Sequence, residues 1–263
     1  MYKISEFAKP KMNISYSSSQ PWKCVAITLD NQSKRYKSFL RNNNHLNISS
    51  FQGIKGINLT KCEIVNQGLG TEALMKSSIF TYGLIGNAAS HKAIWENLVK
   101  SDLGCLVLED DCHTHPNIAE YISINIKKLM EVDICLFGIN TNSILKCISP
   151  AGLTSLSSFN PKHPSQDWIK NAFSKTNIRD IEGHKLLKAL GMCAYFISPQ
   201  GAEKLIKEIF PLSLDTTRIP LVSDKMPAIS VDRAGCRIYP SIHAFVCQPF
   251  LAYTSNLDSS TTI

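Results

Sequence analysis

The chain has 263 residues, of which 44% are hydrophobic and 19% are charged. This balance excludes an intrinsically disordered chain, and the length suits one large domain better than two. The net charge is +7, from 28 basic and 21 acidic residues, which would suit a solvated surface, an anionic membrane or a phosphorylated ligand. No basic run carries interleaved aromatic residues, so no nucleic-acid-binding motif is recognised and no nucleic-acid partner is expected.

The cysteines and the hydropathy pattern indicate the compartment. Nine cysteines form no Cys-x-x-Cys pair, and Cys105 and Cys135 lie in apolar runs, as buried free thiols do in a reducing compartment. A zinc site at Cys112, His113 and His115 is an alternative, but the spacing fits no usual zinc pattern. The N-terminus lacks the apolar core of a signal peptide, and no apolar run reaches the ~18 residues of a membrane span. We expect a cytoplasmic protein, with at most peripheral contact to an anionic membrane at its inner face.

The first half of the chain predicts alternating strands and helices. Residues 1–20 are expected to form a flexible extension. CVAITL (24–29) predicts a buried strand, and the helical spacing of apolar residues predicts a helix over 33–41. A second strand is expected over 51–57. This strand–helix–strand opening is typical of nucleotide-binding α/β domains.

Further elements continue the alternation. They are a helix over 86–100, a buried strand GCLVLE (104–109), a helix over 117–130, a strand over 134–137 and a strand CAYFIS (193–198). Ser198-Pro199 then predicts the start of a helix that ends near Phe210. Residues 149–165, rich in Ser, Pro and Gly, are expected to form a functional loop. The domain is expected to span 21–250, followed by a tail over 251–263.

The strongest chemical feature is LVLEDD (106–111), in which a buried strand ends in Glu109, Asp110 and Asp111. Such a strand delivers its carboxylates to the carboxyl edge of a sheet, where α/β proteins bind ligands. Carboxylate oxygens suit Mg²⁺ or Mn²⁺, which proteins commonly share with substrate phosphates. The plainer interpretation is a solvated acidic turn after a strand.

Two neighbouring segments together resemble glycosyltransferase family 25, the lipooligosaccharide and collagen galactosyltransferase family. GLIGNAASHKAIW (83–95) is similar to the family's Gly-x-x-Gly-x-x-x-Ser-His-x-x-x-Trp helix, and a strand ending in Glu-Asp-Asp follows after a short gap. The matching residues are Gly83, Gly86, Ser90, His91, Trp95, Glu109, Asp110 and Asp111. A more diffuse similarity extends over about 24–260 and includes VAITLDNQSKR (25–35) and SDKMP (223–227).

The resemblance implies a single GT-A-like (Rossmann-like) α/β domain with a mixed, mainly parallel twisted sheet flanked by helices. It implies inverting, metal-dependent transfer of a sugar, galactose by preference, from a UDP-sugar to a hydroxyl of a glycan or glycolipid acceptor, such as lipooligosaccharide or another surface polysaccharide. The implied cofactors are Mn²⁺ or Mg²⁺ and the UDP-galactose donor. Asp110 and Asp111 would hold the metal.

The resemblance also implies roles for individual residues. The expected donor contacts are Thr28, Leu29, Arg35, Gly86, Ser90, Glu109 and Asp110. Inversion needs a general base on the acceptor hydroxyl, for which Asp224 is the first candidate and Asp215 the second. His91 is expected among the catalytic residues, lining the donor or acceptor cleft, although it could be a core histidine. Arg35 could pair with a phosphate or be an ordinary surface residue, and Asp224 could be a loop carboxylate.

Two alternatives from other functional classes remain. One is a catalytically silent protein of the same fold that binds a nucleotide sugar and never releases UDP. The other is a nucleic-acid-binding protein, which only the positive charge suggests, and which would show a steep salt dependence on generic DNA or RNA.

Overall fold

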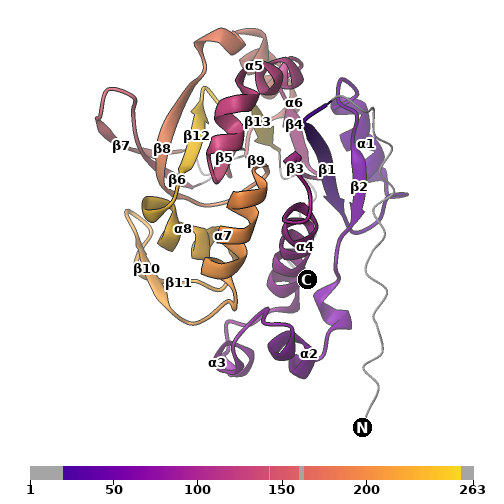
Figure 1. Cartoon of the computed structure of the whole chain (residues 1–263), viewed down its shortest axis with the longest axis vertical. Helices are drawn as coiled ribbons and strands as arrows, with labels where there is room; N and C mark the ends of the chain where they lie inside the picture. The colour runs from indigo at the N-terminus through magenta and orange to yellow at the C-terminus, as the bar shows by residue number, and fades with distance from the viewer. Residues whose placement is uncertain (1–19, 142, 160–162, 256–263) are drawn as a thin grey trace.

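The computed structural model describes residues 20–141, 143–159 and 163–255. The predicted extension therefore lies outside the described residues, except for Gln20. The described chain forms an α/β fold in which one large sheet has helices on both faces (Figure 1). The α-helices are α1 (Lys34–Asn42), α2 (Lys61–Asn66), α3 (Glu72–Lys76), α4 (Tyr82–Leu98), α5 (Ile118–Glu131), α6 (Gln166–Ser174), α7 (Pro199–Ile209) and α8 (Val231–Ile238).

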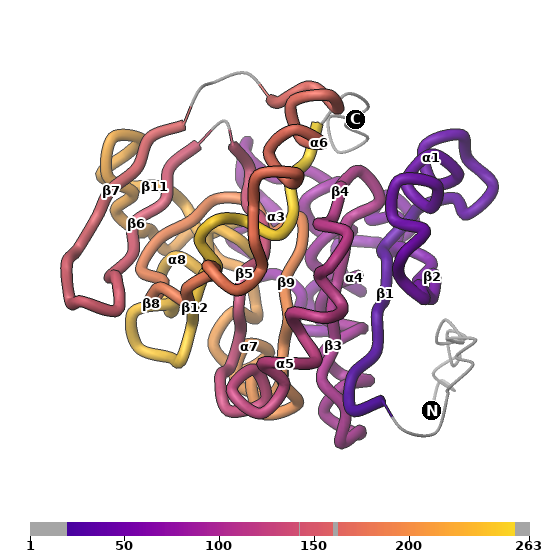
Figure 2. The backbone as a smooth tube through the Cα atoms, turned by 90° about the horizontal axis from the view of Figure 1, so that it is seen from above, coloured from indigo at the N-terminus to yellow at the C-terminus, as the bar shows by residue number. Residues whose placement is uncertain are grey.

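The large sheet has nine strands in the order β2-β1-β3-β9-β5-β12-β8-β6-β7, and Figure 2 shows it spread from β2 at one edge to β7 at the other. Two small two-stranded sheets pair β10 with β11 and β13 with β4. The strands are β1 (Trp22–Thr28), β2 (Ser49–Gln52), β3 (Gly104–Glu109), β4 (Cys112–Thr114), β5 (Ile134–Gly138), β6 (Ile144–Ile148), β7 (Thr154–Ser158), β8 (Glu182–Ala189), β9 (Ala194–Ile197), β10 (Thr216–Ile219), β11 (Ser223–Pro227), β12 (Ala244–Gln248) and β13 (Ala252–Thr254).

The expected α/β class and mixed sheet are confirmed, but the expectation of a mainly parallel sheet is wrong. Of the eight neighbouring strand pairs in this sheet, β1–β2, β1–β3 and β5–β12 are parallel and the other five are antiparallel. Two strands account for four of the five antiparallel pairs: β9, between β3 and β5, and β8, between β12 and β6. An apolar run predicts that a strand is buried, but it carries no information about the strand's direction or neighbours.

Both faces of the central strands are buried, which explains their uninterrupted apolar sequences. In β3, Cys105 and Val107 face the core cluster formed with α4, α7 and α8, whereas Leu106 and Leu108 face the cluster formed with α1 and α5. This period-2 alternation divides one apolar run between two hydrophobic layers. The carboxyl end of β3 then emerges between both layers, which is where the Glu-Asp-Asp sequence begins.

The predicted positions of the main elements agree with the structure, with boundary differences. The helix expected over 86–100 is α4 and begins earlier, after the capping residue Thr81. The strand expected over 51–57 is the shorter β2, followed by a 3₁₀ turn at Gly56–Asn58. Eight of the nine cysteines are buried free thiols, and the exception is Cys62.

Two segments expected to be irregular contain strands. The loop over 149–165 includes β7, which forms a hairpin with β6. The tail over 251–263 begins with β13, which pairs with β4, and Leu251 and Ala252 are fully buried. The serine- and threonine-rich composition concealed these strands, because edge and ribbon strands need few apolar residues. Residues 256–263 lie outside the described part of the chain.

Candidate functional site

Asp110 and Asp111 follow the carboxyl end of β3, and the Arg35 side chain forms ion pairs with both. The Arg35 Nε lies 2.7 Å from Asp110 Oδ1, and an Arg35 terminal nitrogen lies 3.4 Å from Asp111 Oδ2. All three side chains are at most 20% exposed. Arg35 reaches this position because Ser33 caps α1 directly after β1. The structure therefore brings together three of the residues predicted for the donor and metal site.

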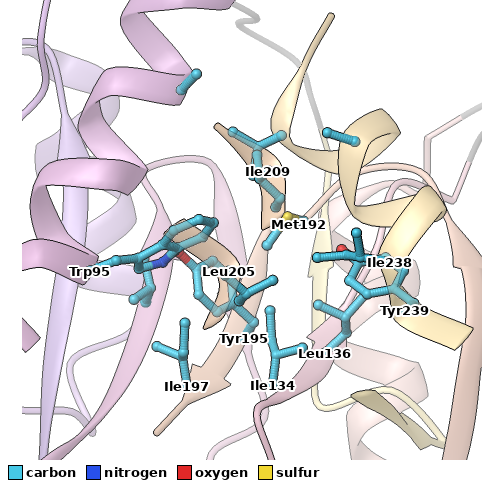
Figure 3. Close-up of a cluster of buried hydrophobic side chains, with 14 of the residues drawn as sticks. Trp95, Ile134, Leu136, Met192, Tyr195, Ile197, Leu205, Ile209, Ile238 and Tyr239 are labelled. Atoms are coloured by element: carbon cyan, nitrogen blue, oxygen red, sulfur yellow. The ribbon is translucent and has the colours of Figure 1, made fainter. Parts of the chain in front are cut away.

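Glu109 and His91 form the second part of the cluster. His91 lies on α4 and is 1% exposed, and its Nε2 lies 4.0 Å from Glu109 Oε1. On its other side, His91 Nδ1 lies 2.7 Å from the Tyr195 hydroxyl, which accepts a hydrogen bond from the Trp95 indole N–H at 2.9 Å. Figure 3 shows Trp95 and Tyr195 side by side in the core. Sequence reasoning expected His91 in the cleft, and the structure places it beneath Glu109.

The hydrogen bonds define which nitrogen of His91 carries a proton. Burial lowers the pKa of His91 to about 4, so the ring is neutral at pH 7. A tyrosine hydroxyl has one proton, and since the Trp95 N–H already donates to the oxygen of Tyr195, the hydroxyl can donate to Nδ1 of His91. The Nε2 then carries the proton and faces Glu109. His91 can thus donate toward Glu109 without adding a charge.

Two carboxyl groups of the cluster, those of Glu109 and Asp111, have raised pKa values. Burial, together with the charges of Asp111 and Asp232, raises the pKa of Glu109 to about 8, although Arg35 acts in the opposite direction. Burial also raises the pKa of Asp111, and Arg35 again acts in the opposite direction. Three carboxyl groups, those of Glu109, Asp110 and Asp111, therefore share Arg35, and a bound cation would relieve this excess of negative charge.

Asp232 is the member of the cluster that sequence reasoning missed. It lies in the first turn of α8, where its Oδ2 accepts a hydrogen bond from the Gly191 N–H at 2.9 Å and its Oδ1 one from the Ser230 hydroxyl. Its charge raises the pKa of both Glu109 and His91. In the sequence, Ser230-Val231-Asp232 is only a short helix start, and nothing local distinguishes this aspartate from a capping residue.

Gly191 positions the backbone N–H that donates a hydrogen bond to Asp232. Its backbone has φ of +84°, and a Cβ would lie 2.3 Å from the Asn140 side chain. A residue with a side chain would be strained here. The tight turn between β8 and β9 therefore requires glycine, and it holds the amide that donates to Asp232.

The two aspartates predicted as general bases lie elsewhere. Asp224, on the β10–β11 hairpin, has a side chain 87% exposed and pairs with Arg218 at 3.0 Å. Asp215 is 68% exposed and pairs with Arg237 at 2.8 Å. Figure 1 shows this hairpin beneath α8, across the molecule from α1. The described contacts connect neither aspartate to the cluster around Glu109, so the geometry does not support the expected catalytic role.

Thr28 and Leu29 lie at the carboxyl end of β1. The register pairs Ile27 with Glu109, so Thr28 and Asp110 leave the sheet at neighbouring positions. Thr28 is 2% exposed, whereas Leu29 is 37% exposed and its carbonyl accepts a hydrogen bond from the Gln52 side chain. Of the two, Leu29 has the accessible surface that a donor contact needs.

Gly86 and Ser90 make structural contacts, and their donor contacts stay predictions. A Cβ on Gly86 would lie 2.5 Å from the Ile54 carbonyl oxygen, so glycine allows α4 to pack on the backbone after β2. Ser90 is 1% exposed, its hydroxyl donates to the Gly86 carbonyl, and it accepts from the Ile54 N–H. The family-like glycine and serine thus hold two backbone segments together.

The donor set fits a shared divalent cation better than a protein-only metal cage. The Asp111 Oδ1 is buried and has no hydrogen-bond partner among the described residues. A buried polar atom of this kind can be satisfied by a bound ligand or ion. No group of three or more His, Cys, Asp or Glu side chains in the described ranges could hold a metal ion. Asp110 and Asp111 could therefore bind Mg²⁺ or Mn²⁺ only together with other oxygens, such as those of a diphosphate.

Comparison with known protein families identifies a match. The model of glycosyltransferase family 25, described as LPS biosynthesis protein, matches residues 23–219. The match includes Arg35, His91 and Glu109-Asp110-Asp111 and ends before Asp232. Comparison with curated proteins gives no match. No helix within the described ranges is both long and apolar enough to cross a membrane. Because the family model covers most of its length, the chain belongs to glycosyltransferase family 25 and is a glycosyltransferase of the kind that acts in LPS biosynthesis.

Proposed function

We propose that the protein transfers a hexose, with galactose as the first donor to test, from a UDP-sugar to a hydroxyl of a lipooligosaccharide or related glycan, with inversion. The observation that carries this proposal is the carboxylate cluster at the end of β3, where Asp111 Oδ1 is buried without a hydrogen-bond partner among the described residues. Membership of the family supports the reaction class. Donor, acceptor and stereochemistry are part of the proposal.

The residues of the cluster divide the work. Asp110 and Asp111 would hold Mn²⁺ or Mg²⁺ with the donor's diphosphate, and Leu29, the exposed residue after β1, would border the nucleoside. When bound, the metal supplies positive charge that stabilises the departing UDP. Arg35, which bridges the two aspartates, keeps a cation beside the same oxygens and can pair with a phosphate.

Asp232 is the better candidate for the general base. Inversion requires a carboxylate opposite the leaving group that accepts the proton of the acceptor hydroxyl. Asp232 lies close enough to Glu109 to raise its pKa, yet it comes from α8, on the other side of the cluster from Arg35 of α1. Hydrogen bonds from Gly191 and Ser230 fix the orientation of its carboxylate. Glu109 and His91 would form the floor between base and diphosphate.

The test is a calorimetric titration of UDP with and without Mn²⁺, together with assays of UDP release from UDP-galactose. Asp111→Ala should abolish the metal-dependent part of UDP binding and the transfer. Asp102→Ala, which removes an exposed aspartate before β3, is the matched control and should behave like the natural protein. Full metal-dependent UDP binding by Asp111→Ala would remove this residue from the metal site. A natural protein that binds donor and never turns over would favour the silent binder.

A cytoplasmic location is a proposal that rests on the free cysteines, and peripheral membrane contact is a proposal that rests on charge. A net charge of +7 attracts the protein to anionic lipid, and salt screens that attraction. Sedimentation with anionic vesicles should therefore exceed sedimentation with neutral vesicles and should disappear at high salt. Equal sedimentation with both lipids would contradict the proposal.

A further inference from the structure

One tryptophan differs from the other two by its exposure. Trp22 and Trp95 are 6% and 0% exposed, whereas Trp168, on α6, is 49% exposed. Tryptophan carries a large apolar ring, and leaving half of it in water forgoes the stabilisation that burial would give. An exposed aromatic surface of this size beside a functional site is a candidate binding surface.

Trp168 is the outer member of a row of aromatic rings. Its ring centroid lies 5.3 Å from that of Tyr253 in an edge-to-face arrangement, and Tyr253 lies 5.5 Å from Phe173 and 5.8 Å from Phe250. Phe250 belongs to the core cluster beneath α4, α7 and α8. The exposed ring is thus supported from behind by rings anchored in the core, and its orientation is fixed.

This row is connected to the carboxylate pair. Tyr253 lies on β13 opposite His113 of β4, and the next residue, Thr254, makes a side-chain hydrogen bond with Asp111. Gln166, at the start of α6, lines a cleft together with Asp110, Asp111 and His113. The helix that carries Trp168 therefore borders the metal and diphosphate site directly.

The strand order of the sheet places this row of aromatic rings away from the end of β1, where the donor is proposed to bind. Thr28 ends β1 and Leu29 follows it. β1 is one neighbour of β3, while β9 and β5 lie on the other side of β3. The start of β13 packs closely against β5. At Gly138 of β5, a Cβ would lie only 2.5 Å from the Ala252 carbonyl oxygen. If the nucleoside lies at β1, a second substrate must approach from the side of β5, β13 and α6.

We propose that Trp168, supported by Tyr253, is the platform on which a sugar ring of the acceptor glycan stacks. Hexose rings have an apolar face of C–H groups that packs on an aromatic ring, while their hydroxyls stay hydrated. This inference rests on the proposed function, since it names the subsite for the acceptor of that reaction. It makes Trp168 a determinant of acceptor affinity that does not contact the donor.

Kinetics with an acceptor chosen by screening hexose-terminated oligosaccharides test this subsite. Trp168→Ala should raise the acceptor KM about tenfold, the change that about 1.4 kcal/mol produces, with kcat and donor KM nearly unchanged. Trp168→Phe keeps an aromatic ring and should recover most of the affinity. Ile124→Ala removes an exposed apolar side chain from α5 (64% exposed) and is the matched control, with kinetics like those of the natural protein.

Tryptophan fluorescence gives a readout that does not depend on turnover. The other two tryptophans are buried, so acceptor binding should change the emission of the natural protein and not that of Trp168→Phe. An unchanged acceptor KM in Trp168→Ala, or an emission that responds to anionic vesicles and not to glycan, would overturn the proposal. Failure of the proposed function is distinct, because the natural protein would then release no UDP from UDP-galactose with any acceptor, whether or not it binds the donor.

Discussion

His91 Nε2 lies 4.0 Å from Glu109 Oε1, so a buried neutral histidine on α4 faces a carboxyl group at the end of β3. The Tyr195 hydroxyl holds the opposite side of the imidazole ring at 2.7 Å. The sheet, the helix and the cluster of carboxylates are thereby connected through three side chains.

The first prediction separates the two candidate bases. Asp232→Asn keeps the shape of the side chain and should lower kcat about 10²- to 10⁴-fold, the usual range for loss of a general base. Donor affinity should change little, because the base acts on the acceptor. Asp224→Asn is the control and should retain turnover, since Asp224 is 87% exposed and paired with Arg218. The measurement is steady-state UDP release beside a donor titration. The opposite ranking of the two variants would return the role to Asp224.

The second prediction concerns pH and stability. Glu109 has a folded-state pKa of about 8 against an ordinary value of 4.5, so between these values the native state binds more protons than the unfolded state, and stability falls as pH rises. His91, lowered from 6.5 to about 4, acts in the opposite direction, but only below about pH 6.5. Urea unfolding of the metal-free protein from pH 6.5 to 8 should therefore show decreasing stability.

Glu109→Gln provides the control for this pH dependence. It removes the titrating group and should flatten the stability profile between pH 6.5 and 8. Mn²⁺ with UDP should stabilise the natural protein more at pH 8 than at pH 6.5, because a metal binds the deprotonated carboxylates. A natural protein whose stability is constant or rises over this interval would show that Glu109 is ionised throughout.

The third prediction compares two buried tyrosines. Tyr195→Phe leaves the Trp95 N–H and His91 Nδ1 without their shared partner and should cost about 1–3 kcal/mol of unfolding free energy. Tyr239→Phe should cost little, because the Tyr239 hydroxyl is buried with no hydrogen-bond partner among the described residues. Denaturant unfolding of both variants measures the difference. Equal losses in the two variants would mean that the Tyr195 hydroxyl contributes no more to stability than the unpartnered hydroxyl of Tyr239, and that Tyr195 acts through the packing of its ring.

The fourth prediction tests the structural role of Gly86. Gly86→Ala places a Cβ 2.5 Å from the Ile54 carbonyl oxygen, and overpacking of this kind costs about 1–3 kcal/mol. Stability should fall, while UDP affinity of the folded protein stays near normal. Gly152→Ala tests a different glycine, at a surface turn with φ of +83° and open space around it, where only backbone strain is expected. A Gly86→Ala protein of normal stability that fails to bind UDP would restore the predicted donor contact.

The sequence by itself determined the local elements and the chemistry at the end of one strand. The apolar run before Glu109 required a strand buried on both faces, and the helix carrying His91 and Trp95 followed from its periodicity. Arg35 was expected near the diphosphate site because it follows the first strand, and it does lie beside Asp110. Local strands and helices depend on residues close together in the sequence, where the spacing of apolar side chains follows a period of 2 in strands and 3.6 in helices.

Only the tertiary structure decided the strand directions and the residues that join the site from afar. Asp232 lies more than 120 positions after Glu109 in the chain and has no chemical motif, so only the packing of α8 reveals its proximity. The proposed role of Trp168 also depends on tertiary packing. Its ring contacts Tyr253 of β13, and the next residue of β13, Thr254, is hydrogen-bonded to Asp111. Asp224 matched a sequence pattern and yet lies on an exposed hairpin. Distant contacts depend on how layers pack against one another, and local periodicity does not encode that packing.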